Sequence, residues 1–141
     1  MKDRIEMNGQ MANEWGRYVI PLEKLSKLNK NFRTALWTGE DMQLTVMSIP
    51  PRTDIGREIH ENFEQMLYIT EGTGLLRMGD EDGGMRYTRR LTVGDSVIVP
   101  RFTLHNIINI GSIPLKLFSV YAPPAHPKGT VHKTKEDAME E

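Results

Sequence analysis

The chain has 141 residues, of which 38% are hydrophobic and 26% are charged, and its formal net charge is −1. These values predict one soluble globular domain with a real core, and the balanced charge excludes the basic field that nucleic-acid binding needs. Cysteine is absent, which excludes a disulfide framework, thiolate catalysis and cysteine-ligated zinc.

The first thirty residues are interrupted by charged side chains, so they do not form the apolar run of a signal peptide. Nowhere does the sequence approach the ~20 consecutive apolar residues of a membrane-spanning helix. We therefore expect a cytoplasmic protein that does not associate with membranes.

Residues 1–31 are expected to form an N-terminal arm and lead-in. Residues 15–22 are typical of an edge strand or an extended segment, because Pro21 cannot donate a ladder hydrogen bond. Residues 22–28 could make two helical turns, since Leu25 and Leu28 recur at helical spacing.

From Phe32 onward the pattern changes to short apolar segments separated by glycine and proline turns. Such a pattern, without long helical periods, predicts an all-β sandwich or barrel over residues 32–125. A C-terminal tail over residues 126–141 is expected to end in a short helix with Thr134 as its N-cap. The expected strands are residues 32–38, 42–49, 57–61, 64–71, 75–79, 85–93, 96–99, 104–110 and 114–121.

Alternation of side chains along a strand places Glu58 and His60 on one face. The next strand carries Gln65 on its more apolar face, so Gln65 is predicted to point inward, and a two-residue turn would set it opposite Glu58 and His60. A one-residue slip in register would bring Glu64 inward instead.

His105 shares a predicted strand face with Ile107 and Asn109. Two histidines, a carboxylate and an amide offer nitrogen and oxygen ligands, which predicts one divalent transition metal: Zn, Mn, Fe, Co or Ni. His60, His105 and Glu58 alone would form the two-histidine, one-carboxylate arrangement of non-haem iron sites. Alternatively, His105 is a core residue bonded to Asn109 or a backbone carbonyl, His60 is a surface residue, Glu58 is a solvated charge or a general base, and Gln65 only orients water.

These residues resemble the cupin family. The first cupin motif, G-x5-H-x-H-x3,4-E-x6-G, is similar in spacing to the stretch from Arg52 to Gly72. In this stretch Arg52 replaces the opening glycine, Glu58 replaces the first histidine and Gln65 replaces the glutamate. The substitutions keep a single carboxylate among the four ligand positions.

The second cupin motif, G-x5-P-x-G-x2-H-x3-N, resembles the stretch from Gly94 through Pro100 and His105 to Asn109. Only Phe102 departs from it, at the second glycine. Within the superfamily the chain is similar to small bacterial proteins of the mannose-6-phosphate-isomerase-like type, through residues 36–39 and 122–132.

The resemblance implies a double-stranded β-helix, the jelly-roll cupin barrel, which is usually a homodimer. Phosphomannose isomerases hold zinc with a glutamine, a glutamate and two histidines. The present chain offers the same four residue types with the glutamine and glutamate positions exchanged, but it is too short for a full isomerase of that kind.

Other residues are candidates for lesser roles. His126 and His132 are expected to cover the mouth or to pack at a subunit contact. Aromatic and sulfur side chains that could line the site are Tyr68, Trp37, Phe102, Tyr121 and Met47. Arginines that could pair with an anion are Arg57, Arg77 and Arg101.

Three functions remain open from the sequence. The first is a metal-dependent enzyme, such as an oxidoreductase, decarboxylase or isomerase, that acts on a small polar molecule with Glu58 as a possible catalytic proton carrier. The second is a non-catalytic binding or sensor module, and the third is a structural barrel with a metal-free polar network. Covalent acyl transfer and nucleotide hydrolysis are disfavoured, because their motifs are missing.

Overall fold

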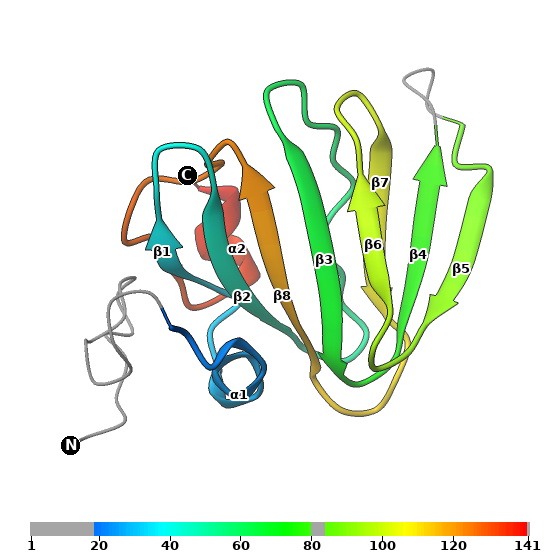
Figure 1. The fold of residues 1–141 in the computed structure, drawn as a ribbon. Helices are drawn as coiled ribbons and strands as arrows, with labels where there is room; N and C mark the ends of the chain where they lie inside the picture. Colours follow the sequence, from blue (N-terminus) through cyan, green and yellow to red (C-terminus); the bar gives the residue numbers. More distant parts are fainter. Residues whose placement is uncertain (1–18, 80–83, 141) are drawn as a thin grey trace.

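The computed structural model describes residues 19–79 and 84–140 (Figure 1). Residues 1–18 of the predicted N-terminal arm lie outside these ranges. The described chain forms two antiparallel sheets, as predicted for an all-β jelly roll. Its helices are short, and none of the described ones has the length and apolar character needed to cross a membrane.

The larger sheet has six strands in the order β6-β3-β8-β2-β1-β9, and the smaller has three in the order β5-β4-β7. Apart from β1–β2 and β4–β5, the neighbours in these orders are not consecutive in the chain, so the chain crosses repeatedly between strands that are far apart in sequence. The strands are β1 Arg33–Thr38, β2 Gln43–Ile49, β3 Glu64–Glu71, β4 Gly74–Gly79, β5 Tyr87–Leu91, β6 Ser96–Val99, β7 Leu104–Asn109, β8 Leu115–Ala122 and β9 Val131–His132.

An apolar core lies between the two sheets. It is built from alternate residues, as the strand period requires, so that Leu67 and Ile69 of β3 face Ile107 of β7 across the interior. Complete burial of each such side chain contributes about 1.5–3 kcal/mol. The members are Phe32, Met47, Ile49, Leu67, Ile69, Leu76, Leu91, Val97, Val99, Ile107, Leu115 and Leu117.

Two helices flank the larger sheet. Helix α1, Leu22–Leu28, confirms the predicted helical turns and packs Leu25 against Leu36 and Val46 on the outer face. Helix α2, Lys135–Met139, has Thr134 as its N-cap with a capping box, as predicted. Ala138 of α2 packs against the inner core, so α2 lies at one end of the barrel interior.

The predicted strand over residues 57–61 is wrong. This segment runs along β7 but makes only isolated bridges, Asp54 to Ile108 and Glu58 to His105. Gly56 interrupts the ladder because it adopts a φ of 109° and donates its N–H to the Asn106 side chain rather than to a backbone carbonyl.

Strand β9 was not predicted. It comes from the segment expected to be a tail, and it pairs with β1 through Arg33 to His132 and Thr34 to Val131. The end of the chain therefore completes the larger sheet and brings His132 to its inner side, beside Arg33.

Candidate metal centre

Strand β7 fixes the innermost histidine. His105 is 2% exposed, and its Nδ1 lies 3.0 Å from the carbonyl oxygen of Thr103. A carbonyl can only accept, so Nδ1 carries the hydrogen and the Nε2 lone pair is left for a ligand. Burial lowers the pKa of His105, although the bond to Thr103 opposes the shift. The ring is therefore neutral at pH 7, as a metal ligand must be.

The segment of residues 53–60 brings the other two side chains to β7. Glu58 and His105 exchange two backbone hydrogen bonds, each 2.9 Å long, which sets the residues directly opposite each other. Further along, the carbonyl oxygen of His60 accepts a 2.8 Å bond from the Phe102 N–H. Irregular pairing thus still fixes the backbone at both residues.

Glu58, His60 and His105 form one cluster whose candidate ligand atoms all lie within 4.8 Å of one another. Glu58 Oε1 is 3.8 Å from His60 Nε2, and the two imidazole centroids are 4.9 Å apart. The side chains of Glu58 and His60 are 41% and 14% exposed, whereas His105 is buried. The cluster therefore runs from the core to solvent, with Glu58 outermost.

Electrostatics in the cluster favour neutral imidazoles. Burial, with the neighbouring His105 and His126, lowers the pKa of His60 to about 4. Burial raises the pKa of Glu58, although the Arg33 charge opposes this, and the partial exposure of Glu58 limits the shift. Two neutral nitrogens and one carboxylate fit a divalent transition metal, which would replace the hydration that burial has removed.

Gln65 reaches the site from the other sheet. On β3 it is 6% exposed and points inward with Leu67 and Ile69, as predicted, while the alternative Glu64 is exposed. The predicted hairpin is wrong, because β3 pairs with β6 and β8, and Glu58 pairs with His105.

The Gln65 side chain still raises the pKa of His60, so the two lie close together. Its Nε2 donates a 2.8 Å bond to Ser119, but its buried Oε1 has no hydrogen-bond partner among the described residues. An unpaired amide oxygen beside two histidines is the chemistry that a fourth ligand or a bound water would satisfy.

A line of rings continues from the cluster into the barrel. Phe63 lies 4.4 Å from His60 and 5.3 Å from Tyr121, measured between ring centroids. Tyr121 lies 5.3 Å from His126, and His126 lies 6.1 Å from His132. His126 and His132 therefore continue this line of rings as far as β9.

The other predicted wall residues and anion partners lie in different environments. Tyr68 stacks on Phe118 on the opposite sheet face from Gln65, so it does not line the site. Phe102 is 50% exposed, and Arg77 and Arg101 are exposed. Met47 is buried in the core, and Trp37 is half-buried at the end of β1.

Sequence reasoning missed Arg33. This residue is 5% exposed, and its NH1 lies 3.1 Å from Nδ1 of His132. Its charge acts on both Glu58 and His60. The sequence did contain a signal, because Arg33 is a charged residue within an apolar predicted strand. Arginine is almost never fully buried without a partner, so such a position indicates a specific role.

A cavity of about 430 Å³ opens beside the cluster. Arg33, Arg57, Glu58 and His126 line it, together with residues of α2 that include Lys135 and Met139. Arg57 is thus the one predicted anion partner that lines this space. The volume suits a small molecule, and the lining carries more positive than negative groups.

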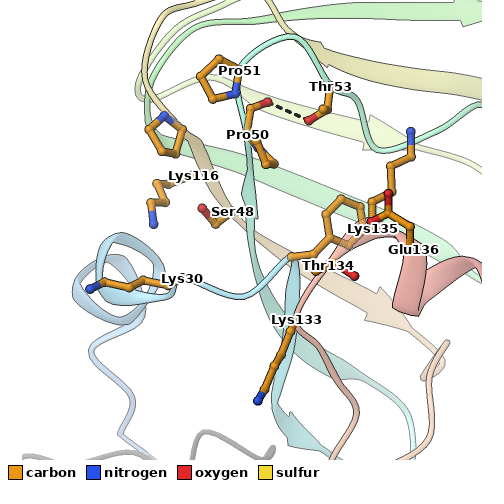
Figure 2. A pocket seen from close by; sticks show the side chains of 12 residues that line it. Lys30, Ser48, Pro50, Pro51, Thr53, Lys116, Lys133, Thr134, Lys135 and Glu136 are labelled. Carbon is orange, nitrogen blue, oxygen red and sulfur yellow. Dashed lines mark hydrogen bonds between the residues drawn. The ribbon is translucent and has the colours of Figure 1, made fainter.

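A second and larger pocket, of about 670 Å³, contains none of the three cluster residues. Figure 2 shows its lysines, with Lys116 on one side near Lys30 and Lys135 on the other beside α2. Lys116 donates to the Asn29 carbonyl, and Lys135 pairs with Asp54. Because no side chain of the cluster lines it, this pocket is a weaker candidate site than the smaller cavity, which Glu58 lines.

Comparison with known proteins agrees with this fold. The family described as "Cupin domain" matches residues 45–121. The chain is 47% identical over 122 residues to the uncharacterized protein YrkC of Bacillus subtilis (strain 168), covering 86% of this chain and 66% of YrkC, just under two thirds of that relative. It is 31% identical over 122 residues to the uncharacterized protein L612 of Acanthamoeba polyphaga mimivirus, covering 86% and 74% of the two chains. The crystal structure of BH2720 from Bacillus halodurans superimposes with a TM-score of 0.86 at 44% identity, covering 88% of this chain and 94% of that one.

Proposed function

The chain belongs to the cupin family, and from that premise we propose that it is a metal-dependent enzyme acting on a small polar molecule. The observation that carries the proposal is the cluster of Glu58, His60 and His105, whose candidate ligand atoms lie within 4.8 Å of one another. We assign these three residues as ligands of one divalent transition metal, with the Gln65 amide as a fourth ligand or as the group that orients a water.

The metal would supply Lewis acidity, polarising a carbonyl or carboxylate oxygen of the bound molecule. The protein residues set the conditions for this chemistry. The Thr103 carbonyl fixes the His105 tautomer, and Ser119 holds the Gln65 amide in place. The Phe63 ring packs against the His60 ring, and Tyr121 packs in turn against Phe63, so that one side of His60 faces aromatic rings.

Glu58 has a second possible role. It is the most exposed member of the cluster, and burial raises the pKa of its carboxyl. When it is not bound to metal, this carboxyl can accept or release a proton at Oε1, 3.8 Å from His60 Nε2. Oxidation, decarboxylation and isomerisation of a carbonyl, carboxylate or sugar-like molecule can each use such a group.

The finer grouping is also a proposal. We place the chain with the small, cytoplasmic, homodimeric cupins of the mannose-6-phosphate-isomerase-like type, supported by its four candidate ligand types. This grouping is a statement about sequence relationship, and it does not include isomerase activity. The alternative function is a binding or sensor cupin that holds metal and ligand without turnover.

The test is elemental analysis of protein purified without chelator. We expect about one metal per chain in the wild type, and its loss in His60→Ala and His105→Ala. His132→Ala is the matched control, because it removes a buried histidine outside the cluster and should keep the metal. Equal metal in all four proteins, or none after incubation with Mn, Fe, Co, Ni and Zn, would overturn the assignment.

If metal is bound, a second measurement separates the two functions. Metal-loaded protein is incubated with small carbonyl, carboxylate and sugar compounds and followed by NMR. Conversion that disappears in His105→Ala supports the enzyme, whereas saturable binding without conversion supports the binding or sensor cupin.

A further inference from the structure

Arg33 occupies an unusual place for a charged residue. In the register of the larger sheet, it pairs with Met47 of β2, which pairs in turn with Leu117 of β8. Both neighbours belong to the core between the sheets, so Arg33 lies on the inner face of the barrel. It is 5% exposed, and it lines the cavity that Glu58 also lines.

The partners of Arg33 do not neutralise its charge. NH1 bonds Nδ1 of His132, NH2 lies 3.9 Å from the Met47 sulfur, and the guanidinium carbon lies 5.5 Å from the centroid of the Phe32 ring. Nε is buried without a hydrogen-bond partner, and within residues 19–79 and 84–140 no carboxylate forms an ion pair with this side chain.

A buried guanidinium without a carboxylate partner is costly to the folded protein, because a hydrogen bond to a neutral imidazole does not replace the hydration that its charge has lost. His132 cannot share the charge, since its Nδ1 must be unprotonated to accept the bond from Arg33. A position that costs stability in the free protein is typical of a group that awaits an oppositely charged ligand.

Two further unpaired atoms lie on the same inner face. Among the described residues, the buried side-chain atoms without a partner are Arg33 Nε, Thr45 Oγ1 and Gln65 Oε1. Thr45 lies between Ala35 and Ser119 in the ladder, and it is two residues from Met47 on β2, which puts the two side chains on the same face. Arg33 Nε and Thr45 Oγ1 can each donate to an anion, whereas Gln65 Oε1 is an acceptor that faces the metal cluster. Two unpaired donors on one inner face indicate that a ligand with acceptor oxygens binds there.

We propose that the barrel cavity binds a small carboxylate, with Arg33 pairing to the carboxylate group. The planar guanidinium matches a carboxylate in shape, and one unpaired positive charge matches one carboxylate better than it matches a phosphate of higher charge. Since Glu58 lines the same cavity, a second oxygen of the ligand can face the proposed metal. This second contact rests on the proposed function, whereas the pairing with Arg33 does not.

The experiment measures binding rather than turnover. Protein that has been freed of metal with a chelator is titrated by calorimetry at constant ionic strength. The ligands are acetate, glycolate, pyruvate, malonate and succinate, with malonamide as the uncharged analogue of malonate. Inorganic phosphate forms a separate arm. The same titrations are repeated after loading with Mn²⁺, on the wild type, Arg33→Met, Arg33→Lys and the exposed-lysine control Lys133→Met.

We expect at least one carboxylate to bind the chelated wild type and Lys133→Met with equal affinity, and malonamide not to bind. Arg33→Met should raise the Kd about tenfold or more, and Arg33→Lys should raise it by less, because lysine keeps the charge and loses the planar fork. Arg33→Met should also melt no lower than the wild type without anion, since it removes an unpaired buried charge. Arg33→Lys keeps the test readable if Arg33→Met does not fold.

The proposal is overturned if no carboxylate binds the wild type, if the affinity of folded Arg33 variants is unchanged, or if phosphate binds more tightly than every carboxylate. The proposed function can fail separately. If binding depends on Arg33 but does not tighten when Mn²⁺ is added, the carboxylate site stands and its contact with the metal is refuted.

Discussion

The site draws its residues from two segments that differ sharply in regularity. Strand β7 pairs with β4 over its whole length, from Leu104 to Asn109. The segment of residues 53–60, on the other edge of β7, is held by two isolated bridges and by a bond from the Gly56 N–H to the Asn106 side chain. The regular segment carries the buried His105, and the irregular one carries the more exposed Glu58 and His60.

This difference parallels the two sequence motifs. The motif that ends in β7 departs from the cupin pattern only at Phe102, whereas the first motif departs at Arg52 and Glu58, in and next to the irregular segment, and at Gln65 on the regular strand β3. The backbone of a fully paired strand cannot shift without breaking ladder bonds, so we infer that β7 sets the frame of the site. The irregular segment can then accept a new ligand type, such as Glu58, at little structural cost.

The largest expected effect comes from loosening the end of β7. The buried Asn109 side chain donates to the carbonyls of Ile49 and Ile113 and accepts from the Gly111 N–H. Asn109→Ala removes all three bonds and leaves a buried carbonyl unpaired, so it should lower the free energy of unfolding by about 3 kcal/mol. Urea denaturation of the chelated protein measures this.

The matched control is Asn106→Ala on the same strand, which should cost only about 1 kcal/mol because its bonds reach a segment that is held locally. Equal losses in the two variants would contradict the view that β7 is the rigid half of the site.

The regular half of the molecule was also the predictable half. Alternation placed Gln65 inward on β3 and put His105 on the same face as Ile107, and the structure buries all three. Glycine and proline marked most turns because those residues stop ladders locally. These features depend on neighbours in sequence, which is why sequence alone could predict them.

The irregular half was predicted less well, because its structure depends on distant partners. A two-residue gap before β3 suggested a hairpin, but the Asn106 side chain and the positive φ of Gly56 pair the segment with β7 instead. Arg33 was overlooked for the same reason. Its importance depends on β9, a two-residue strand almost a hundred positions later in the chain.

A smaller and more local effect is expected for Asn106→Ala. Loss of the 3.0 Å bond should expose the Gly56 amide to hydrogen exchange while the β7 amides stay protected, and metal affinity should fall about tenfold because Glu58 and His60 are held less firmly. NMR-detected exchange and metal titration measure both. Asp54→Ala removes the other partner of Asn106 but leaves the Gly56 bond, so Gly56 should remain protected. An unchanged Gly56 rate in Asn106→Ala would sink the idea that this bond holds the segment.

The smallest effect concerns the backbone at the glycine positions of the two motifs. Gly72 and Gly94 have φ of 90° and 97°, and the residues at the two remaining positions keep the same sign, with φ of 66° at Arg52 and 62° at Phe102. The backbone thus retains a glycine conformation after the glycine has gone. A left-handed conformation costs an ordinary residue about 1–2 kcal/mol, and the extra freedom of unfolded glycine offsets about 0.5–1 kcal/mol of that.

Arg52→Gly should therefore raise the free energy of unfolding by about 0.5 kcal/mol, which replicate urea denaturation can resolve. Arg52 is the cleaner choice, because its side chain is exposed and Phe102 would also lose packing. Gly94→Ala is the converse control: a Cβ there meets nothing within 4 Å, so the loss of about 1 kcal/mol that we expect would come from the backbone alone. If Arg52→Gly destabilised the protein as much as Gly94→Ala does, the arginine side chain rather than the backbone would be what holds this turn, and the irregular half of the site would depend on a contact that regular strands do not need.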